Sequence, residues 1–244
     1  MPRFFVSKNS ISDELITITD KDAYHIARSL RMAVGDEIYV SDGESHEYLA
    51  RLTKIRDEEC TAEIIEEHQS AAEPKMNVTL YMAYPKGDKL EVVVQKAVEL
   101  GATRIVPFES SRCIKRPKEE KIAKHGARLS KIAEEAAKQC GRAIVPEVSF
   151  PLSFKEMLKD LEAIDLKLIC YEKESDLSLK ALLSKSTPDS IAVIVGCEGG
   201  FSPEEVEAAV AAGCHAVTLG KRILRCETAP SAALSMISYQ YEMI

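Results

Sequence analysis

The sequence predicts an α/β protein with a parallel sheet, preceded by a small β-barrel. Three observations support this. Short β-prone runs fill the first seventy residues, strand-like and helical runs alternate from about residue 77 onward, and the segment between them, 68–77, is polar, aperiodic and contains a proline. Regular alternation of strand and helix is typical of a parallel sheet with helices on both faces. We therefore expect two domains, residues 1–72 and residues 73–244.

The runs of the first domain are short, and one ends in Asp42-Gly43, a turn signal. In the last run Cys60, Ala62 and Ile64 alternate with polar residues, as in a half-buried strand. The runs are "FFV" (4–6), "LITIT" (15–19), "GDEIYVSDG" (35–43), "YLARLTKI" (48–55) and "CTAEIIEE" (60–67), with one helix at about 20–31. This composition predicts a small β-barrel.

In the second domain, strand-like runs are separated by helical patterns. The strands are expected at 78–84, 103–108, 167–171, 191–196 and 216–220, and the helices at about 87–100, 118–140, 153–162, 203–212 and 229–242. Ser202, Pro203 and Glu205 form a capping-box pattern, and Pro230 lies in the first turn of the last helix. Ligands of such sheets bind at the carboxyl ends of the strands, so the loops there are the first places to search for a site.

Composition excludes several classes of protein. No segment approaches the ~18–20 apolar residues of a membrane helix, and "MPRFFVSKNS" lacks the pattern of a secretory signal, so we expect a cytoplasmic location. The seven cysteines include no CxxC pair, which favours reduced thiols over disulfides. The five histidines are scattered, so no metal site is predicted.

Charge is unevenly distributed along the chain. The net charge is −7 overall, but it is −7 for residues 1–72, +6 for 73–142 and −6 for 143–244. A basic middle third can bind phosphates although the whole protein is acidic. A solvated, lysine-rich helix face explains the same pattern without function.

The stretch "VGCEGGFSPEE" (195–205) follows an apolar strand and leads into a capped helix. Its glycines, Gly196, Gly199 and Gly200, do not have the GxGxxG spacing of a dinucleotide loop, and Glu198 would repel phosphates. Glycines allow close approach of the backbone, and a carboxylate suits a ligand that is cationic or carries hydroxyl groups. A tight turn that requires glycine is the structural alternative.

The stretch "LGKRILRCETAP" (219–230) follows the next strand, so the two loops should be neighbours. Backbone groups of residues 219–226 can surround a heterocycle, with Ile223 and Leu224 as apolar walls. Helix capping explains Glu227 and Thr228. It does not explain a cluster of cations, Lys221, Arg222 and Arg225, after a buried strand.

These two stretches, together with "VVVQKAVELGATRIVPFESSRC" (92–113) and "EEAAKQCGRAIVP" (134–146), resemble the RsmE family of bacterial SPOUT-class methyltransferases. The N-terminal "MPRFFV" and "HIARSLRMAVGDEIYVSDG" are similar to the PUA-like RNA-binding domain of that family. The resemblance therefore extends over nearly the whole chain. One departure is Cys197, where the family usually has proline. We expect it to alter the rigidity of the loop and to leave activity intact.

The resemblance implies a SPOUT α/β domain with a C-terminal trefoil knot, a rare exception to the rule against knots. It also implies a homodimer, S-adenosylmethionine as cofactor, and methylation of N3 of a uridine in 16S ribosomal RNA. The knot loops should hold the cofactor, so the expected cofactor-binding residues are Gly196, Gly199, Gly200, Leu219, Gly220, Ile223, Leu224 and Cys226.

Catalysis requires uridine N3 to lose its proton, and an arginine near the developing anion favours that loss. We expect Arg225 to have this role, with Glu198 as a weaker companion. An alternative is that Arg225 only ties the loop by pairing with Glu198 or Glu227. The flanking RNA must be held while the base is extruded. The candidates for these contacts are Arg3, Arg28, Arg31, Lys86, Arg112 and Arg142.

Other functions remain open at this stage. A non-catalytic RNA-binding or ribosome-assembly factor would need only the barrel and a basic surface, and a methyltransferase could act on another RNA position. A nucleotide-dependent oxidoreductase is disfavoured because no phosphate loop is present. For the dimer, the last helix carries Ala233, Leu234, Ile237 and Tyr241 at helical spacing. The same stripe could instead face the helix's own sheet.

Overall fold

The computed structural model describes residues 1–244 except 45, 115–118, 186 and 243–244. The chain forms two compact units. The first comprises Met1–Glu73 and Ala137–Val145, and the second comprises Pro74–Ala136 and Pro146–Ile244. This differs from a division at 72/73, because the end of the long helix and the segment after it belong to the first unit.

The first unit is built on a five-stranded sheet with the order β1-β3-β4-β5-β2. The β1–β3 pair is parallel and the other pairs are antiparallel. The strands are β1 (Arg3–Phe5), β2 (Leu15–Thr19), β3 (Glu37–Ser41), β4 (His46–Ile55) and β5 (Glu59–Gln69), and the short helices are η1 (Lys8–Ser10), α1 (Asp20–Tyr24) and η2 (His25–Ser29). β5 continues to Gln69, so the predicted linker, 68–77, begins two residues too early. Phe4, Ile16, Ile26 and Ile38 lie in one buried apolar core.

The second unit is built on a seven-stranded sheet with the order β12-β10-β11-β6-β7-β8, and β9 also pairs with β7. Every pairing in it is parallel. Its strands are β6 (Asn77–Ala83), β7 (Arg104–Glu109), β8 (Glu147–Val148), β9 (Leu152–Ser153), β10 (Leu166–Cys170), β11 (Ser190–Val195) and β12 (His215–Val217). Its helices are α2 (Lys89–Glu99), α3 (Glu119–Cys140), α4 (Phe154–Asp160), η3 (Leu161–Ala163), α5 (Leu179–Leu183), α6 (Pro203–Ala211) and α7 (Thr228–Tyr241).

The predicted alternation of strands and helices is confirmed. The central strands β6 and β11 are buried on both faces, as is typical of apolar strands in a parallel sheet. The expected capping box of α6 is present, with the Ser202 hydroxyl accepting from the Glu205 amide at 3.2 Å. The short elements β8, β9 and α5 were not predicted. The predicted first residue of the long helix, 118, lies outside the described residues.

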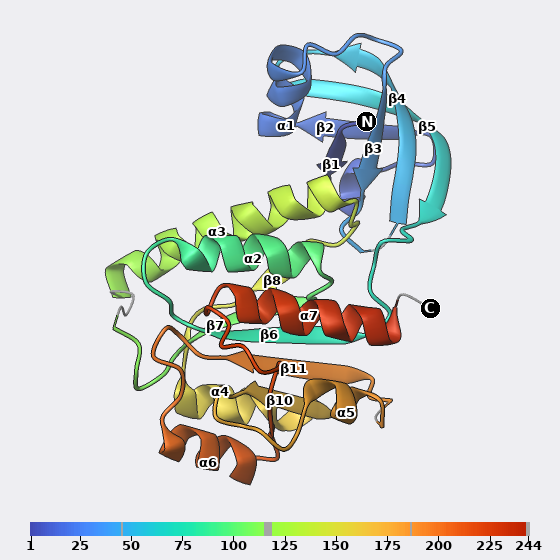
Figure 1. Cartoon of the computed structure of the whole chain (residues 1–244). Helices are drawn as coiled ribbons and strands as arrows, with labels where there is room; N and C mark the ends of the chain where they lie inside the picture. The colour runs from blue at the N-terminus through green and yellow to red at the C-terminus, as the bar shows by residue number, and fades with distance from the viewer. Residues whose placement is uncertain (45, 115–118, 186, 243–244) are drawn as a thin grey trace. The chain divides into compact units, whose positions relative to one another are not determined.

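The apolar stripe of α7 faces the interior of its own unit. Ala233, Leu234 and Ile237 are at most 3% exposed, and α7 packs against α2, α5 and β11 (Figure 1). The Tyr241 hydroxyl donates to the Leu183 carbonyl at 3.0 Å. The argument for a dimer from this stripe is therefore wrong, since burial in the monomer already explains the helical spacing.

Candidate active site

A cavity of about 550 Å³ lies in the second unit, at the carboxyl ends of three neighbouring strands. Its walls are the segments that follow β10, β11 and β12, namely 170–172, 195–200 and 217–227, together with Lys89 and Ala229. This volume is within the range of small-molecule sites, ~300–1,000 Å³. The sheet topology places the cavity where parallel α/β folds bind their ligands.

The loop 196–200 is tightly turned, and its glycines are required by the turn. The Gly200 amide donates to the Cys197 carbonyl at 2.9 Å, and Gly200 has a φ of +62°. A Cβ on Gly196 would lie 3.1 Å from the backbone of Gly200. A larger residue at either position would shift the wall of the cavity.

The loop after β12 exposes most of its side chains. Gly220 has a φ of +123°, and its amide donates to the Thr218 hydroxyl at 3.2 Å. Ile223 is 83% exposed, which is high for an isoleucine and leaves it available to a ligand. The Arg225 carbonyl accepts from the amides of Thr228 and Ala229, so the loop ends by starting α7.

Lys89, the first residue of α2, joins the two loops. Its ammonium lies 3.0 Å from Glu198 Oε1 and 3.2 Å from Glu227 Oε2, and all three side chains are about one-quarter to one-third exposed. The Lys86 amide also donates to both Glu198 oxygens, at 3.1 and 3.2 Å. Both carboxylates are therefore held by Lys89, which lies outside their loops, and Glu198 is also held by the Lys86 amide.

The pKa directions agree with this geometry. Hydrogen bonds to Glu198 and Glu227 raise the pKa of Lys89. Partial burial opposes ionisation of Glu198, but the bonds from Lys89 and the backbone lower its pKa overall. Backbone hydrogen bonding lowers the pKa of Glu227, with Cys226 and Lys89 adding to it. All three groups are charged at neutral pH.

Arg225 is exposed, and among the described residues no ion pair involves its side chain. The alternative in which Arg225 ties the loop requires an ion pair with Glu198 or Glu227, and neither pair is present among the described residues, where both carboxylates pair with Lys89. The guanidinium is free to contact a ligand or substrate at the cavity.

All the residues expected at the cofactor and catalytic sites line this one cavity. They are Gly196, Glu198, Gly199, Gly200, Leu219, Gly220, Ile223, Leu224, Arg225 and Cys226. The sequence reading missed Lys89, Tyr171 and Glu172. A signal existed for all three, because Tyr171 is the last residue of a predicted strand and Lys89 and Glu172 come shortly after the ends of predicted strands.

Cys197, the departure from the family pattern, is 6% exposed and forms part of the cavity wall. Its thiol is hydrogen-bonded to that of Cys113, which lowers the pKa of Cys197 and raises that of Cys113. Arg112, beside Cys113, donates from Nη1 to the Gly199 carbonyl at 2.8 Å. Arg112 and Cys113, in the segment after β7, thus hold the loop 196–200 in place.

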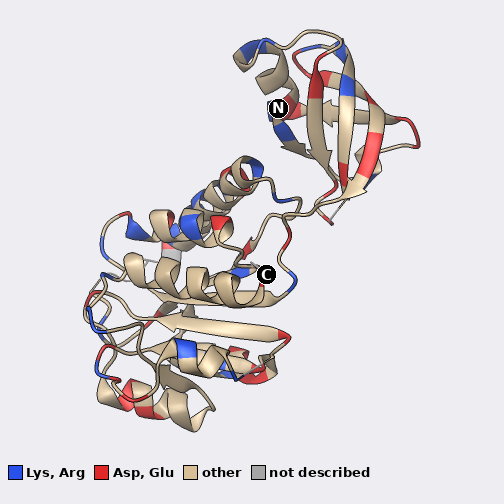
Figure 2. Cartoon of the chain, turned by 45° about the vertical axis from the view of Figure 1, so that its right-hand side comes forward, with Lys and Arg blue, Asp and Glu red and all other residues tan. Residues whose placement is uncertain are grey.

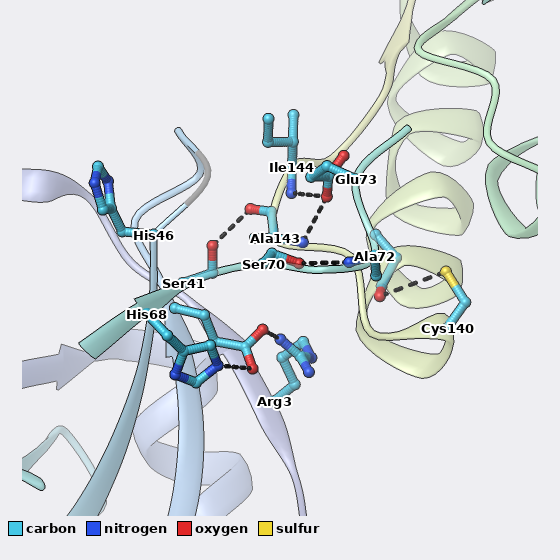
Figure 3. Close-up of polar contacts among 12 residues, drawn as sticks. Arg3, Ser41, His46, His68, Ser70, Ala72, Glu73, Cys140, Ala143 and Ile144 are labelled. Atoms are coloured by element: carbon cyan, nitrogen blue, oxygen red, sulfur yellow. Dashed lines mark hydrogen bonds and ion pairs between the residues drawn. The ribbon is translucent and has the colours of Figure 1, made fainter. Parts of the chain in front are cut away.

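Three of the six arginines and lysines expected to bind RNA, namely Arg3, Arg28 and Arg142, form ion pairs with carboxylates of the first unit. Arg3 and His68 both bond to Glu47, a carboxylate that is 5% exposed (Figure 3). Arg142 is 3% exposed and pairs with Glu73 at 3.0 Å. A side chain this buried cannot reach a phosphate, so the prediction for Arg142 is wrong, and Arg3 has a structural partner.

Glu73 and Ser41 organise the segment that contains Arg142. Glu73 Oε1 accepts from the amides of Ala143 and Ile144 at 2.7 and 2.9 Å, and the Ser41 hydroxyl donates to the Ala143 carbonyl at 2.6 Å (Figure 3). These bonds explain why residues 137–145 belong to the first unit. Through its own ion pair with Glu73, Arg142 contributes to the structure of that unit.

The other expected RNA contacts lie at the surface. Arg28 is exposed but makes a bidentate pair with Asp57, with distances of 2.6 to 3.0 Å. Arg31, Lys86 and Arg112 are exposed. Lysine and arginine are also distributed along α2 and α3, whereas acidic residues predominate on the strands of the first unit (Figure 2).

Among the described residues, no helix has both the length and the apolar character needed to span a membrane. No group of three or more His, Cys, Asp and Glu side chains is placed to hold a metal ion in this part of the chain.

Comparison with known proteins identifies the family. A family model described as an RNA methyltransferase domain matches residues 72–238, and one described as an RNA methyltransferase PUA domain matches residues 18–65. The ribosomal RNA small subunit methyltransferase E of Bacillus subtilis is 34% identical, over 100% of this chain and 98% of that protein. The chain belongs to the ribosomal RNA small subunit methyltransferase E family. The corresponding protein of Synechocystis is 33% identical, over 97% of this chain and 77% of its own length.

Solved structures of similar proteins include cofactor complexes. The ribosomal RNA small subunit methyltransferase E of Neisseria gonorrhoeae, bound to S-adenosyl methionine, has 35% identity, a TM-score of 0.90, and coverage of 99% of this chain and 98% of that one. A putative methyltransferase of Legionella pneumophila, in complex with the cofactor SAM, has 29% identity, a TM-score of 0.87, and coverage of 97% and 96%. The expected α/β fold with a PUA domain is thereby confirmed.

Proposed function

We propose that this protein transfers the methyl group of S-adenosylmethionine to N3 of a uridine in 16S ribosomal RNA. Family membership supports the activity class, an adenosylmethionine-dependent ribosomal RNA methyltransferase. The choice of N3 of uridine rests on the resemblance read from the sequence. The observation that carries the proposal is the convergence of both glycine-containing loops and an unpaired Arg225 on one cavity.

The cavity fits S-adenosylmethionine in size and in the chemistry of its walls. Backbone amides and carbonyls of residues 219–226 suit the polar edge of a base, and Ile223 and Leu224 suit its faces. Carboxylates at Glu172, Glu198 and Glu227 suit a ligand with positive charge. When bound, the cofactor supplies an activated methyl group on a sulfonium, so the protein's task is alignment and removal of one proton from the acceptor.

Arg225 is the residue we assign to the acceptor. Its guanidinium can stabilise negative charge at uridine N3 as the proton leaves. Glu198 contributes by holding its loop, through Lys89 and the Lys86 amide, rather than by a free carboxylate.

RNA binding is assigned to the exposed cations and to the PUA domain. Arg31, Lys86 and Arg112 remain the candidates among the predicted residues, and the exposed Lys121, Lys124 and Lys131 of α3 add to them. Arg28 can contribute only by exchanging Asp57 for phosphate. We also propose the trefoil knot in the C-terminal part of residues 73–244, on the strength of family membership.

A homodimer and a cytoplasmic location are also proposed on the strength of family membership. For the dimer this is the remaining support, because the apolar stripe of α7 is buried within its own unit. Light scattering tests the dimer directly. We expect a mass about twice the 27.0 kDa of the chain across micromolar concentrations. A mass near that of one chain throughout the range would reject it.

The decisive experiment uses small ribosomal subunits from cells that lack this modification. Incubation with the purified protein and methyl-labelled S-adenosylmethionine should yield 3-methyluridine at a single position, identified by digestion and mass spectrometry. Label on a ribose or another base would establish a methyltransferase with a different acceptor. Cofactor and RNA binding without transfer would instead indicate an assembly factor.

A further inference from the structure

Lys89 occupies an unusual position among the residues around the cavity. It is the first residue of α2, follows the carboxyl end of β6, and belongs to neither cofactor loop. Its ammonium nevertheless contacts Glu198 on the loop after β11 and Glu227 on the loop after β12, at 3.0 and 3.2 Å. The Cys226 sulfur lies 3.9 Å away. One side chain therefore joins the two loops that line the cavity.

The charge balance of this cluster is asymmetric. One ammonium faces two carboxylates, so the cluster carries a net charge of −1 beside the cavity. The rest of the cavity wall carries Glu172, which has no ion pair among the described residues, and three exposed cations, Lys221, Arg222 and Arg225. S-adenosylmethionine has a sulfonium cation, whereas the product of methyl transfer is a neutral thioether. The charge of the cluster therefore affects the two molecules differently.

We propose that Lys89 is a positioning residue for the cofactor, joining the two loops and limiting the preference of the cavity for the sulfonium over the thioether product. This rests on the proposed placement of S-adenosylmethionine in the cavity. Without the ammonium, the loops lose their shared partner and both molecules bind less tightly. The two carboxylates then keep their charge, and the cavity becomes more negative, so the product loses more affinity than the substrate.

Isothermal titration of the full-length protein with S-adenosylmethionine and with S-adenosylhomocysteine tests this without RNA. For Lys89→Met we expect the affinity for S-adenosylmethionine to fall roughly tenfold, from loss of two partly exposed ion pairs. The ratio of the two affinities should shift toward S-adenosylmethionine by roughly fivefold. Lys89→Arg keeps the charge and both pairs, so it should restore both values.

Lys96→Met is the matched control. It removes a lysine of the same helix that also has an ion pair, with Glu99 at 2.8 Å, but that does not line the cavity. It should leave both affinities unchanged. Thermal unfolding of each variant separates a local effect from a general loss of stability.

Several results would overturn the inference. If Lys89→Met loses the same affinity for both molecules, Lys89 only holds the two loops together. If neither affinity changes, Lys89 has no role in binding the cofactor. Failure of Lys89→Arg to restore the ratio would exclude the charge as the cause. Gly196→Ala tests the assumption that S-adenosylmethionine binds in this cavity, because the added Cβ would displace the cavity wall. If that variant binds S-adenosylmethionine normally, the cofactor lies elsewhere and the placement itself fails.

Discussion

Arg225 is a single exposed side chain, and the catalytic role that we propose for it predicts a distinct dependence of the rate on pH. If the guanidinium promotes ionisation of uridine N3, Arg225→Ala should lose roughly 100-fold or more in kcat at neutral pH. The loss should shrink as the pH rises toward the pKa of free uridine, where the base ionises without help. Single-turnover rates from pH 6.5 to 9.5 measure this.

Arg225→Lys is the companion variant, since it keeps the charge but not the planar fork. It should recover only part of the rate. A loss in Arg225→Ala that is independent of pH and accompanied by weaker cofactor binding would reassign Arg225 to the loop structure.

Tyr84 gives a prediction about stability. It is 6% exposed, and burial, with a smaller contribution from Glu109, raises its pKa to about 12 from an ordinary 10.0. Below pH 10 the phenol is protonated in both folded and unfolded chains, so it contributes no pH dependence. Above pH 10 the unfolded chain ionises first, and stability falls until the folded phenol ionises near pH 12.

We expect Tyr84→Phe to reduce the loss of stability between pH 9 and 11.5 by about 2 kcal/mol. Urea unfolding at these two pH values measures it. Tyr239→Phe removes a phenol that is 73% exposed and should leave the alkaline loss as it is. Identical pH profiles for wild type and Tyr84→Phe would contradict the buried environment of Tyr84.

At the scale of the element, α3 contains an unusual residue for a helix interior. Gly126 lies within Glu119–Cys140, and a Cβ added there would meet no atom within 4 Å. Because glycine costs about 1 kcal/mol relative to alanine in a helix, Gly126→Ala should stabilise the protein by that amount and raise Tm by about 2–4 °C. Calorimetry checks this.

Gly213 provides the opposite case at the end of α6. It has a φ of +88°, and its amide donates to the Val210 carbonyl at 2.9 Å. The same change to alanine should therefore destabilise, by about 1 kcal/mol. Stabilisation by both substitutions would show that backbone conformation does not control their effects.

At the scale of the molecule, all the described residues that line the cavity belong to the second unit. A fragment that begins at Pro74 should therefore bind S-adenosylmethionine within about twofold of the full chain, yet fail to methylate ribosomal subunits. Titration and methyl transfer, measured on the same preparation, test this. A folded fragment with a large loss of cofactor affinity would contradict the separation of roles.

The sequence by itself determined the types and order of most elements. Apolar periodicity and turn residues act over a few positions, so all strands except the two-residue β8 and β9, and the capped start of α6, could be predicted from the sequence. The two cofactor loops were also identified, because glycines and charges after a buried strand are a local signal. All ten predicted cofactor and catalytic residues line the same cavity.

Only the tertiary structure decided which side chains meet. Glu198 is held by Lys89, 109 positions away, and Arg142 is buried against Glu73, 69 positions away. The stripe on α7 could face a partner or its own sheet, and the spacing is the same in both cases. Local pattern determines which face of an element is apolar or charged, but the partner of that face depends on how distant segments pack.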